Sequence, residues 1–286
     1  MTQALLLLLL TQTSYNRSRV GSDDTNLNAQ CLYWKEGTVI EYHQNADGNP
    51  ETGDSAFTAI TTAFDSWQAQ LDFCGSLSFK EGARTTSRQV GYVDAATDNE
   101  NIVLFREKKC TAVAPTTDAC WGKGTCGNAY DCWQHSVGAI AITTTSYTPS
   151  SGKILDSDVE LNQPSFIFTT VDSPVCVAGH YTTGCVATDV QNTVTHEVGH
   201  VLGLAHISLA GSTMFPRADP GDLGKRVIDP GSKQFICDVY PKGGVSKSCL
   251  TVPFDGKLGK PSQGCAAAPG GLVFALAAVL ALRRRR

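Results

Sequence analysis

Residues 195–206 read T-H-E-V-G-H-V-L-G-L-A-H and hold three of the six histidines of the chain, His196, His200 and His206. Apolar side chains recur at helical spacing from position 190 to position 202, and Asp189 precedes them where a helix cap is expected. Four helical residues turn through about 400°, which leaves His196 and His200 on one face and roughly 6 Å apart along the axis. Two imidazoles so placed can bind one zinc ion at about 2.0 to 2.1 Å. The segment therefore predicts a helix that presents a metal site.

The rest of the motif supplies what a catalytic zinc site needs beyond two ligands. Glu197 points away from the ligand line, where its carboxylate can hold a water as general base without binding the metal. Gly203 can take the left-handed conformation that ends a helix, and this turn would bring His206 round as the third ligand. Three protein ligands leave a fourth position open for water, which separates a catalytic zinc site from a structural one. We expect peptide-bond hydrolysis in which Glu197 takes a proton from the attacking water and passes it to the leaving amine.

The extended motif H-E-x-x-H-x-x-G-x-x-H, with Met214 eight positions after His206, resembles that of the metzincin metalloproteases and, within them, the matrixin-like branch. The resemblance covers residues 137–240. It implies one catalytic zinc, Met214 packed beneath the metal, and Phe215 and Pro216 as walls of the pocket for the residue after the scissile bond. It also implies an edge strand at residues 137–143 that pairs with extended substrate through the positions Ala139, Ile140 and Ala141.

The same resemblance implies a mixed α/β fold of the metzincin-like zincin type. In it a twisted mixed sheet lies over the active-site helix, and a smaller, irregular C-terminal subdomain follows. Helical periodicity predicts a core helix over residues 55–71 with Asp54 as its cap. Asp229 and Pro230 predict a helix start for residues 230–239. The sheet is expected to begin after Gly75, with strands at residues 77–79, 90–93, 102–105, 137–143 and 154–161.

The strand predicted at residues 154–161 carries Asp156, Asp158 and Glu160 on one face, because strand side chains alternate. Three carboxylates could hold calcium, which prefers several oxygen ligands. A solvated strand face is the favoured interpretation, since no loop-like ligand spacing accompanies them. His135 and His180 are interpreted as ordinary histidines and not as ligands of a further metal.

The eleven cysteines of the chain never occur in C-x-x-C spacing, which favours disulfides in an oxidising compartment over metal binding. Cys265 stands apart near the C-terminus, and the other ten can form five bridges. Their pairing is left open, except that Cys176 and Cys185 are close enough in sequence to predict a local loop.

Both ends of the chain carry short apolar runs. Leucines at positions 5–10 predict a secretory signal peptide at residues 1–14, with a buried N-terminal strand as the alternative. Residues 272–282 are apolar and precede four arginines, but at about 1.5 Å per residue they span only roughly 16 Å of a ~30 Å hydrocarbon core. This end, with Gly264-Cys265 before it, resembles the sorting signals of myxobacteria and related Gram-negative bacteria, which implies Cys265 as the processing or attachment position. A weak permanent membrane anchor is the alternative.

These features predict one catalytic domain at residues 15–250, a linker at 251–264 and a sorting or anchor tail at 265–286. We expect a monomeric, secreted or cell-surface zinc endopeptidase that acts on proteins or peptides and meets the membrane only through its tail. Without the four terminal arginines, 19 basic residues stand against 27 acidic ones, and this net charge of −8 argues against a nucleic-acid partner. The alternatives are a non-catalytic adhesion module with a structural zinc, which would have no use for Glu197, and a hydrolase of peptidoglycan cross-links.

Overall fold

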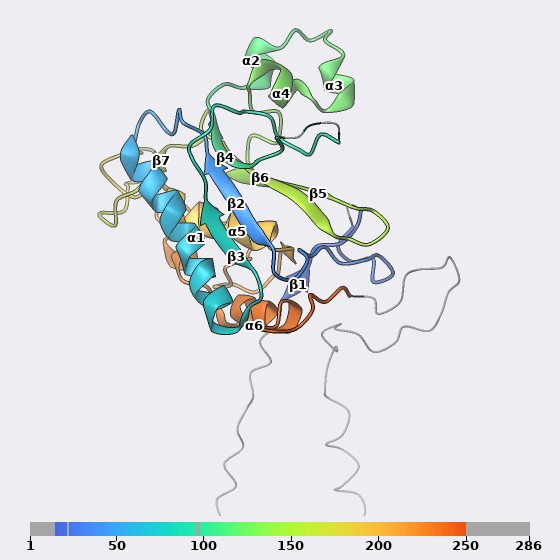
Figure 1. Ribbon diagram of the computed structural model, residues 1–286. Helices are drawn as coiled ribbons and strands as arrows, with labels where there is room; N and C mark the ends of the chain where they lie inside the picture. The colour runs from blue at the N-terminus through green and yellow to red at the C-terminus, as the bar shows by residue number, and fades with distance from the viewer. Residues whose placement is uncertain (1–14, 22, 95, 97, 250–286) are drawn as a thin grey trace, which may run out of the picture.

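A computed structural model describes residues 15–249 apart from residues 22, 95 and 97 (Figure 1). The predicted signal peptide, linker and tail, Cys265 included, lie outside the described residues. Within the described part, no helix combines the length and apolar character needed to cross a membrane.

The helices and strands follow one another from the N-terminal to the C-terminal end of the described part. In chain order they are β1 (Asn16–Arg17), β2 (Val39–Gln44), α1 (Asp54–Cys74), β3 (Ser78–Glu81), β4 (Asn101–Arg106), α2 (Cys110–Val113), α3 (Cys120–Lys123), α4 (Cys126–Tyr130), β5 (Ala141–Tyr147), β6 (Ile154–Asn162), β7 (Phe168–Thr169), β8 (Thr188–Asp189), α5 (Val190–Val201), β9 (Leu204–Ala205), the 3-10 helix η1 (Gly224–Arg226) and α6 (Pro230–Val239).

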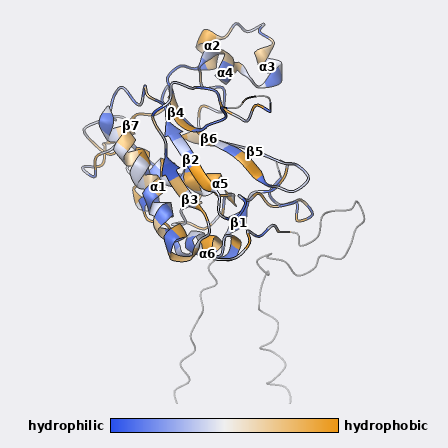
Figure 2. Cartoon of the chain, viewed as in Figure 1, coloured by the Kyte–Doolittle hydropathy of each residue, from blue (hydrophilic) through white to orange (hydrophobic). Residues whose placement is uncertain are grey.

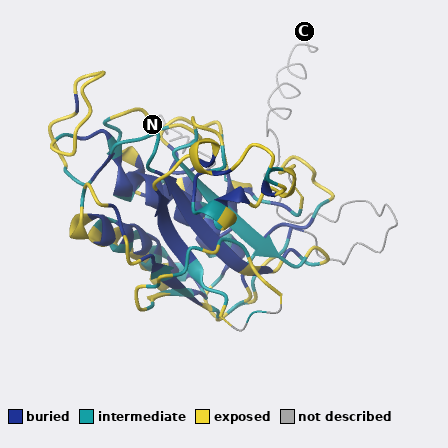
Figure 3. Cartoon of the chain, turned by 90° about the horizontal axis from the view of Figure 1, so that it is seen from above, coloured by how far each residue is buried: buried dark blue, intermediate teal, exposed yellow. Residues whose placement is uncertain are grey.

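The main sheet has five strands in the order β3-β2-β4-β6-β5. Strands β3, β2, β4 and β6 run parallel, whereas β5 pairs antiparallel with β6 and forms the edge. All residues of β5 are partly exposed, in contrast to the buried central strands (Figure 3). This mixed sheet with its helices confirms the predicted α/β class.

The core lies between the sheet and two helices, α1 and α5. Helix α1 buries one apolar stripe, and its opposite face is hydrophilic (Figure 2). Trp67 on this stripe is fully buried, and its indole Nε1 donates to the carbonyl oxygen of Thr195 at 2.8 Å. The packing of α1 thereby fixes the position of α5 by a directed bond as well as by apolar contact.

Three predictions about local structure are wrong. The sheet does not begin after Gly75, because β2 lies before α1 and occupies the second position of the sheet. Asp54 is the first residue of α1 and not its cap, since the preceding Gly53 has φ 56° and no side chain caps the helix. The edge strand starts at Ala141, because residues 137–140 form a turn whose carbonyl at Ala139 accepts a bond of 2.8 Å from Asn162 Nδ2.

No strand forms at residues 90–93 either. The backbone N–H groups of these four residues donate to side chains instead of to a neighbouring strand. Their acceptors are, in order, Asn128, Asp158, Ser146 and Asn99. The segment is therefore bonded to α4, β6 and β5 through side-chain acceptors without joining the sheet.

The acidic face of β6 is buried, so the interpretation of it as a solvated face is wrong. Asp158 is 1% exposed, and its two carboxylate oxygens accept from the backbone N–H groups of Ile102 and Gly91 at 2.9 and 2.6 Å. Glu160 is 2% exposed and pairs with Arg106 Nε at 2.6 Å and His135 Nε2 at 3.1 Å. These carboxylates satisfy buried donors. Calcium at this face stays a prediction.

Five disulfides join the ten cysteines of the described part, which confirms the disulfide interpretation and the predicted Cys176–Cys185 loop. The pairs are Cys31–Cys249, Cys74–Cys237, Cys110–Cys132, Cys120–Cys126 and Cys176–Cys185. The pair Cys74–Cys237 links the end of α1 to α6. Two further pairs hold the short helices α2, α3 and α4, which form a lobe at the opposite end of the molecule from α6 (Figure 1).

Candidate active site

Helix α5 is fixed at its N-terminal end by Asp189, the residue predicted to cap it. Asp189 Oδ1 accepts a bond of 2.7 Å from the backbone N–H of Asn192, which confirms the predicted cap. The same carboxylate pairs with the Arg226 guanidinium, with Nε to Oδ1 at 2.8 Å. The apolar positions of the helix, Val190, Val194, Val198 and Val201, are 0–2% exposed. Burial of this stripe turns the opposite face of α5 towards the cleft.

The chain reverses after α5 at Gly203, whose φ of +96° agrees with the predicted turn. A β-carbon at this position would lie 2.8 Å from the carbonyl oxygen of Leu32, so glycine is required by contact as well as by conformation. Strand β9 then pairs antiparallel with β1, and Asn16 Nδ2 donates to the carbonyl oxygen of His206 at 2.8 Å. These contacts set the position from which His206 reaches back to α5.

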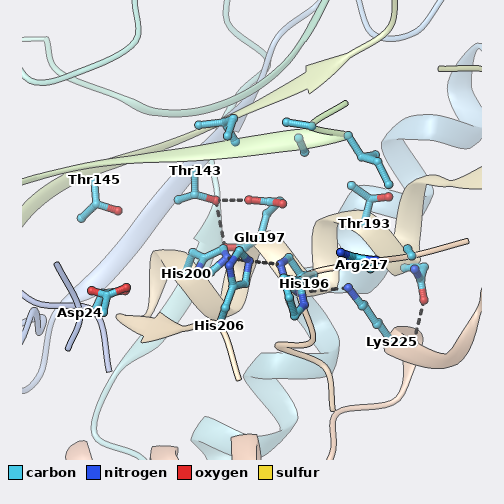
Figure 4. Close-up of a pocket in the computed structure, with 18 of the residues that line it drawn as sticks. Asp24, Thr143, Thr145, Thr193, His196, Glu197, His200, His206, Arg217 and Lys225 are labelled. Atoms are coloured by element: carbon cyan, nitrogen blue, oxygen red, sulfur yellow. Dashed lines mark hydrogen bonds between the residues drawn. The ribbon is translucent and has the colours of Figure 1, made fainter. Parts of the chain in front are cut away.

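The three imidazoles of the motif lie together in the cleft (Figure 4). His206 Nε2 lies 3.1 Å from the Nε2 atoms of both His196 and His200. One ligand atom from each residue lies within 4.8 Å of the others, and among the described residues this is the group that could hold a metal ion. Two Nε2 atoms bound to one tetrahedral zinc at about 2.05 Å would be roughly 3.3 Å apart. The donor set therefore fits a zinc ion.

The hydrogen bonds of the ligand rings determine which nitrogen faces the common point. His196 Nδ1 lies 2.6 Å from the carbonyl oxygen of Thr213, and His200 Nδ1 lies 2.7 Å from that of Leu204. A carbonyl oxygen can only accept, so Nδ1 carries the proton in both rings and Nε2 presents its lone pair. Burial lowers the pKa of all three histidines, that of His206 to about 4. The rings are thus neutral near pH 7 and able to bind a cation.

Glu197 lies beside this cluster and is 5% exposed. Its Oε2 accepts a bond of 2.6 Å from the hydroxyl of Thr143 on β5, which also donates to the Glu197 carbonyl oxygen at 3.2 Å. Burial raises the pKa of the carboxyl group, whereas the bond from Thr143 opposes that rise by stabilising the charged form. The pair joins the predicted base to the edge strand.

Met214 lies beneath α5 and is 1% exposed. A β-carbon added at Gly199 would lie 2.3 Å from its sulfur, so the glycine in the motif allows close packing of the methionine against the helix. The carbonyl oxygen of Met214 accepts from the backbone N–H of Ile207 at 3.0 Å. Asp229, which also caps α6, accepts from the backbone N–H of Thr213 at 2.9 Å. The methionine turn is therefore fixed from both sides of the cluster.

The cluster opens into a cleft of about 660 Å³. Ala139, Ile140, Ala141 and Pro216 line it, and their contact with substrate stays a prediction. Phe215 is not among the described residues that line the cleft, and its carbonyl oxygen instead accepts a bond of 2.5 Å from Lys225 Nζ.

Several residues of the cleft were missed by sequence reasoning. Thr143 lay at the end of a predicted strand, and alternation with Ala141 would have placed both on one face of it. Lys225 is 7% exposed, its Nζ lies 3.4 Å from His196 Nδ1, and burial lowers its pKa. Arg217 and Asp24 also line the cleft. Arg217 and Asp24 come from irregular segments and Lys225 from the three-residue 3-10 helix η1, and neither kind of segment carries a periodic signal in the sequence.

Comparison with known proteins agrees with this geometry. The family model for matrixin matches residues 33–240, a range that includes the whole cluster, Thr143, Met214 and the five-stranded sheet. None of the curated proteins matches the chain.

Proposed function

The chain belongs to the matrixin family of zinc metalloproteases, and on this premise we propose that it is a secreted or surface-attached endopeptidase that hydrolyses internal peptide bonds of proteins. The observation that carries the proposal is the convergence of three histidine Nε2 atoms beside a buried carboxylate. A structural zinc site is closed by four protein ligands, whereas three leave a position for water.

We assign His196, His200 and His206 as the ligands of one catalytic zinc. When bound, zinc supplies a Lewis acid that lowers the pKa of water and polarises the substrate carbonyl. The carbonyl oxygens of Thr213 and Leu204 hold two of the rings in the tautomer that binds metal. Met214 supports the cluster from below through its contact with Gly199.

Glu197 acts as the general base. Its carboxylate takes a proton from the attacking water and gives it to the leaving amine. Thr143 fixes the carboxylate in position through the bond of 2.6 Å, which also favours the ionised form that the first step needs.

Substrate binds along the edge of the sheet. Strand β5 has a neighbour on only one side, so its other edge offers backbone groups to an extended peptide. Ala139, Ile140 and Ala141 lead into this edge and line the cleft, which supports them as contacts. Pro216 closes the side of the cleft that receives the residue after the scissile bond, and Phe215 supports this side by accepting a hydrogen bond from Lys225 Nζ through its carbonyl oxygen.

Five disulfides support an extracytoplasmic location, because such bonds persist in oxidising compartments. We extend the proposal to a signal peptide at residues 1–14 and to sorting or anchoring of a Gram-negative bacterial protein through Cys265. A monomer is proposed as the working state.

The test is digestion of casein by purified protein, with zinc content measured on the same sample. Activity should disappear with a chelator and return with zinc. Glu197→Gln should keep its zinc but lose at least about a thousandfold in kcat/KM, since it lacks the base that both proton transfers use. Glu107→Gln, at an exposed glutamate outside the cleft, is the matched control and should keep full activity. Proteolysis that persists in Glu197→Gln would remove Glu197 from this role.

A further inference from the structure

Two basic side chains lie on the side of the cleft that Pro216 bounds. Lys225 and Arg217 both line the cleft, and Figure 4 shows them beside His196 on the side away from Asp24. Lys225 is nearly buried, and its ammonium group donates to the carbonyl oxygen of Phe215 at 2.5 Å. Arg217 is exposed and carries a permanent charge.

Neither cation is matched by a carboxylate of the protein. Within the described part of the chain, no carboxylate oxygen lies within 4.0 Å of Lys225 Nζ or of the Arg217 guanidinium. Glu197 is bonded to Thr143, and Asp222 Oδ1 accepts from the backbone N–H of Gly224 at 2.8 Å. The charges of Asp222 and Glu197 act on Lys225 only from beyond 4.0 Å. A buried cation without a carboxylate in direct contact is costly and uncommon. A bound molecule with a carboxylate could supply that contact.

The other groups on this side are polar or small, apart from exposed Asp219, which follows Ala218 and also lines the cleft. Thr193 and Asn192 line the cleft from α5, and Asn192 Oδ1 accepts from the backbone N–H of Lys225 at 2.7 Å. Ala218 lines it next to Arg217. An apolar substrate side chain placed here would remove water from the Lys225 ammonium and return no charge to it. A carboxylate would accept bonds from both cations.

We propose that this side of the cleft binds an acidic side chain of the substrate, so that the enzyme prefers Glu or Asp at the residue after the scissile bond. Arg217 and Lys225 are then residues that determine specificity. The inference rests on the proposed peptidase function and on the placement of that residue beside Pro216.

The test compares peptides that differ in one residue. Pairs carrying Glu or Gln after the scissile bond have the same size and differ in charge, and a second set carries the same exchange before the bond. We expect kcat/KM to favour Glu over Gln by about tenfold at the first position, the worth of one charge-assisted hydrogen bond, and not at the second. Arg217→Glu should abolish or reverse the preference. Lys123→Glu, which makes the same change of charge at an exposed site on α3, should leave it intact.

A binding measurement separates this inference from the proposed function. Short peptides that begin with Glu or Gln represent the product on this side of the cleft, and calorimetry measures their affinity without turnover. The Glu peptide should bind about tenfold more tightly to the unmodified protein and lose this advantage in Lys225→Met and Arg217→Glu. Equal binding of the two peptides overturns the inference, even if casein is cleaved. Preferential binding of the Glu peptide upholds it, even if no peptide is cleaved, and in that case the peptidase proposal fails alone.

Discussion

Replacement of Thr143 by valine tests whether the edge strand tunes the catalytic base. The change removes a hydroxyl that donates to Glu197 Oε2 at 2.6 Å and keeps the shape of the side chain. A hydrogen bond to a charged group contributes about 1.5–3 kcal/mol, and one pKa unit corresponds to about 1.4 kcal/mol. The bond stabilises the ionised carboxylate, so its loss should raise the pKa of Glu197 by roughly one to two units.

The assay is the pH dependence of kcat/KM on one peptide substrate. Because Glu197 must be ionised to take the proton, the acid limb of the profile should move to higher pH by roughly one to two units in Thr143→Val. Thr143→Ser retains a hydroxyl and should restore the original limb. Thr145→Val is the matched control, since Thr145 lines the same cleft but bonds to the neutral hydroxyl of Ser157 at 2.9 Å. An acid limb that stays in place, or moves equally in the control, would refute the reasoning.

Two further predictions concern metal binding and stability. His206→Ala should weaken zinc binding by more than ~100-fold, since loss of an outer partner alone costs 10–100-fold, and an unchanged zinc content on dialysis would contradict its role as a ligand. Burial raises the pKa of Asp156 to about 6 and, together with the charge of Asp156, that of Asp158 to about 8, both above the value of about 3.9 in an unfolded chain. The neutral forms therefore stabilise the fold below about pH 4, and this stabilisation is lost as the pH rises through 6 and 8. In urea unfolding, Asp156→Asn should show a smaller fall in stability between about pH 5 and pH 8 than the unmodified protein, and an equal fall would exclude the pair as its source.

The sequence correctly predicted those parts of the site whose geometry depends on residues close together in the chain. The distance from His196 to His200 along a helix, the cap at Asp189 and the positive φ at Gly203 each depend on a few neighbouring residues. The helical spacing of apolar residues predicted the buried stripes of α1 and α5 for the same reason. The resemblance of the motif then pointed to a protein family, and the match of the matrixin model over residues 33–240 shows that the chain belongs to it.

The wrong predictions concern residues whose partners are distant in sequence. Residues 90–93 have the composition of a strand, but Asn128, Asp158 and Ser146, 38 to 67 positions away, supply acceptors that replace a strand partner. Alternation predicted only that the acidic residues of β6 share one face. A pattern of period two does not show whether such a face contacts solvent or buried hydrogen-bond donors of the protein. Lys225 and Arg217 could not be assigned to the site from the sequence, because only the folded chain brings them into the same cleft as His196.

Buried charged groups next to β6 help to position the edge strand β5, along which we propose that substrate binds. Glu160 on β6 pairs with Arg106 on β4 and with His135. Arg106 also bonds to Asp131 at 2.9 Å, which connects the disulfide-linked lobe to β4 and β6, the two strands next to β5 in the sheet. Asn162, at the end of β6, then holds the carbonyl oxygen of Ala139 where the chain enters the cleft. Removal of one partner from such a buried pair leaves the other charge uncompensated, which costs more than the pair contributes. The entry to the edge strand is thus fixed by polar contacts that must all be satisfied together, and this explains how an irregular turn at residues 137–140 holds a defined conformation.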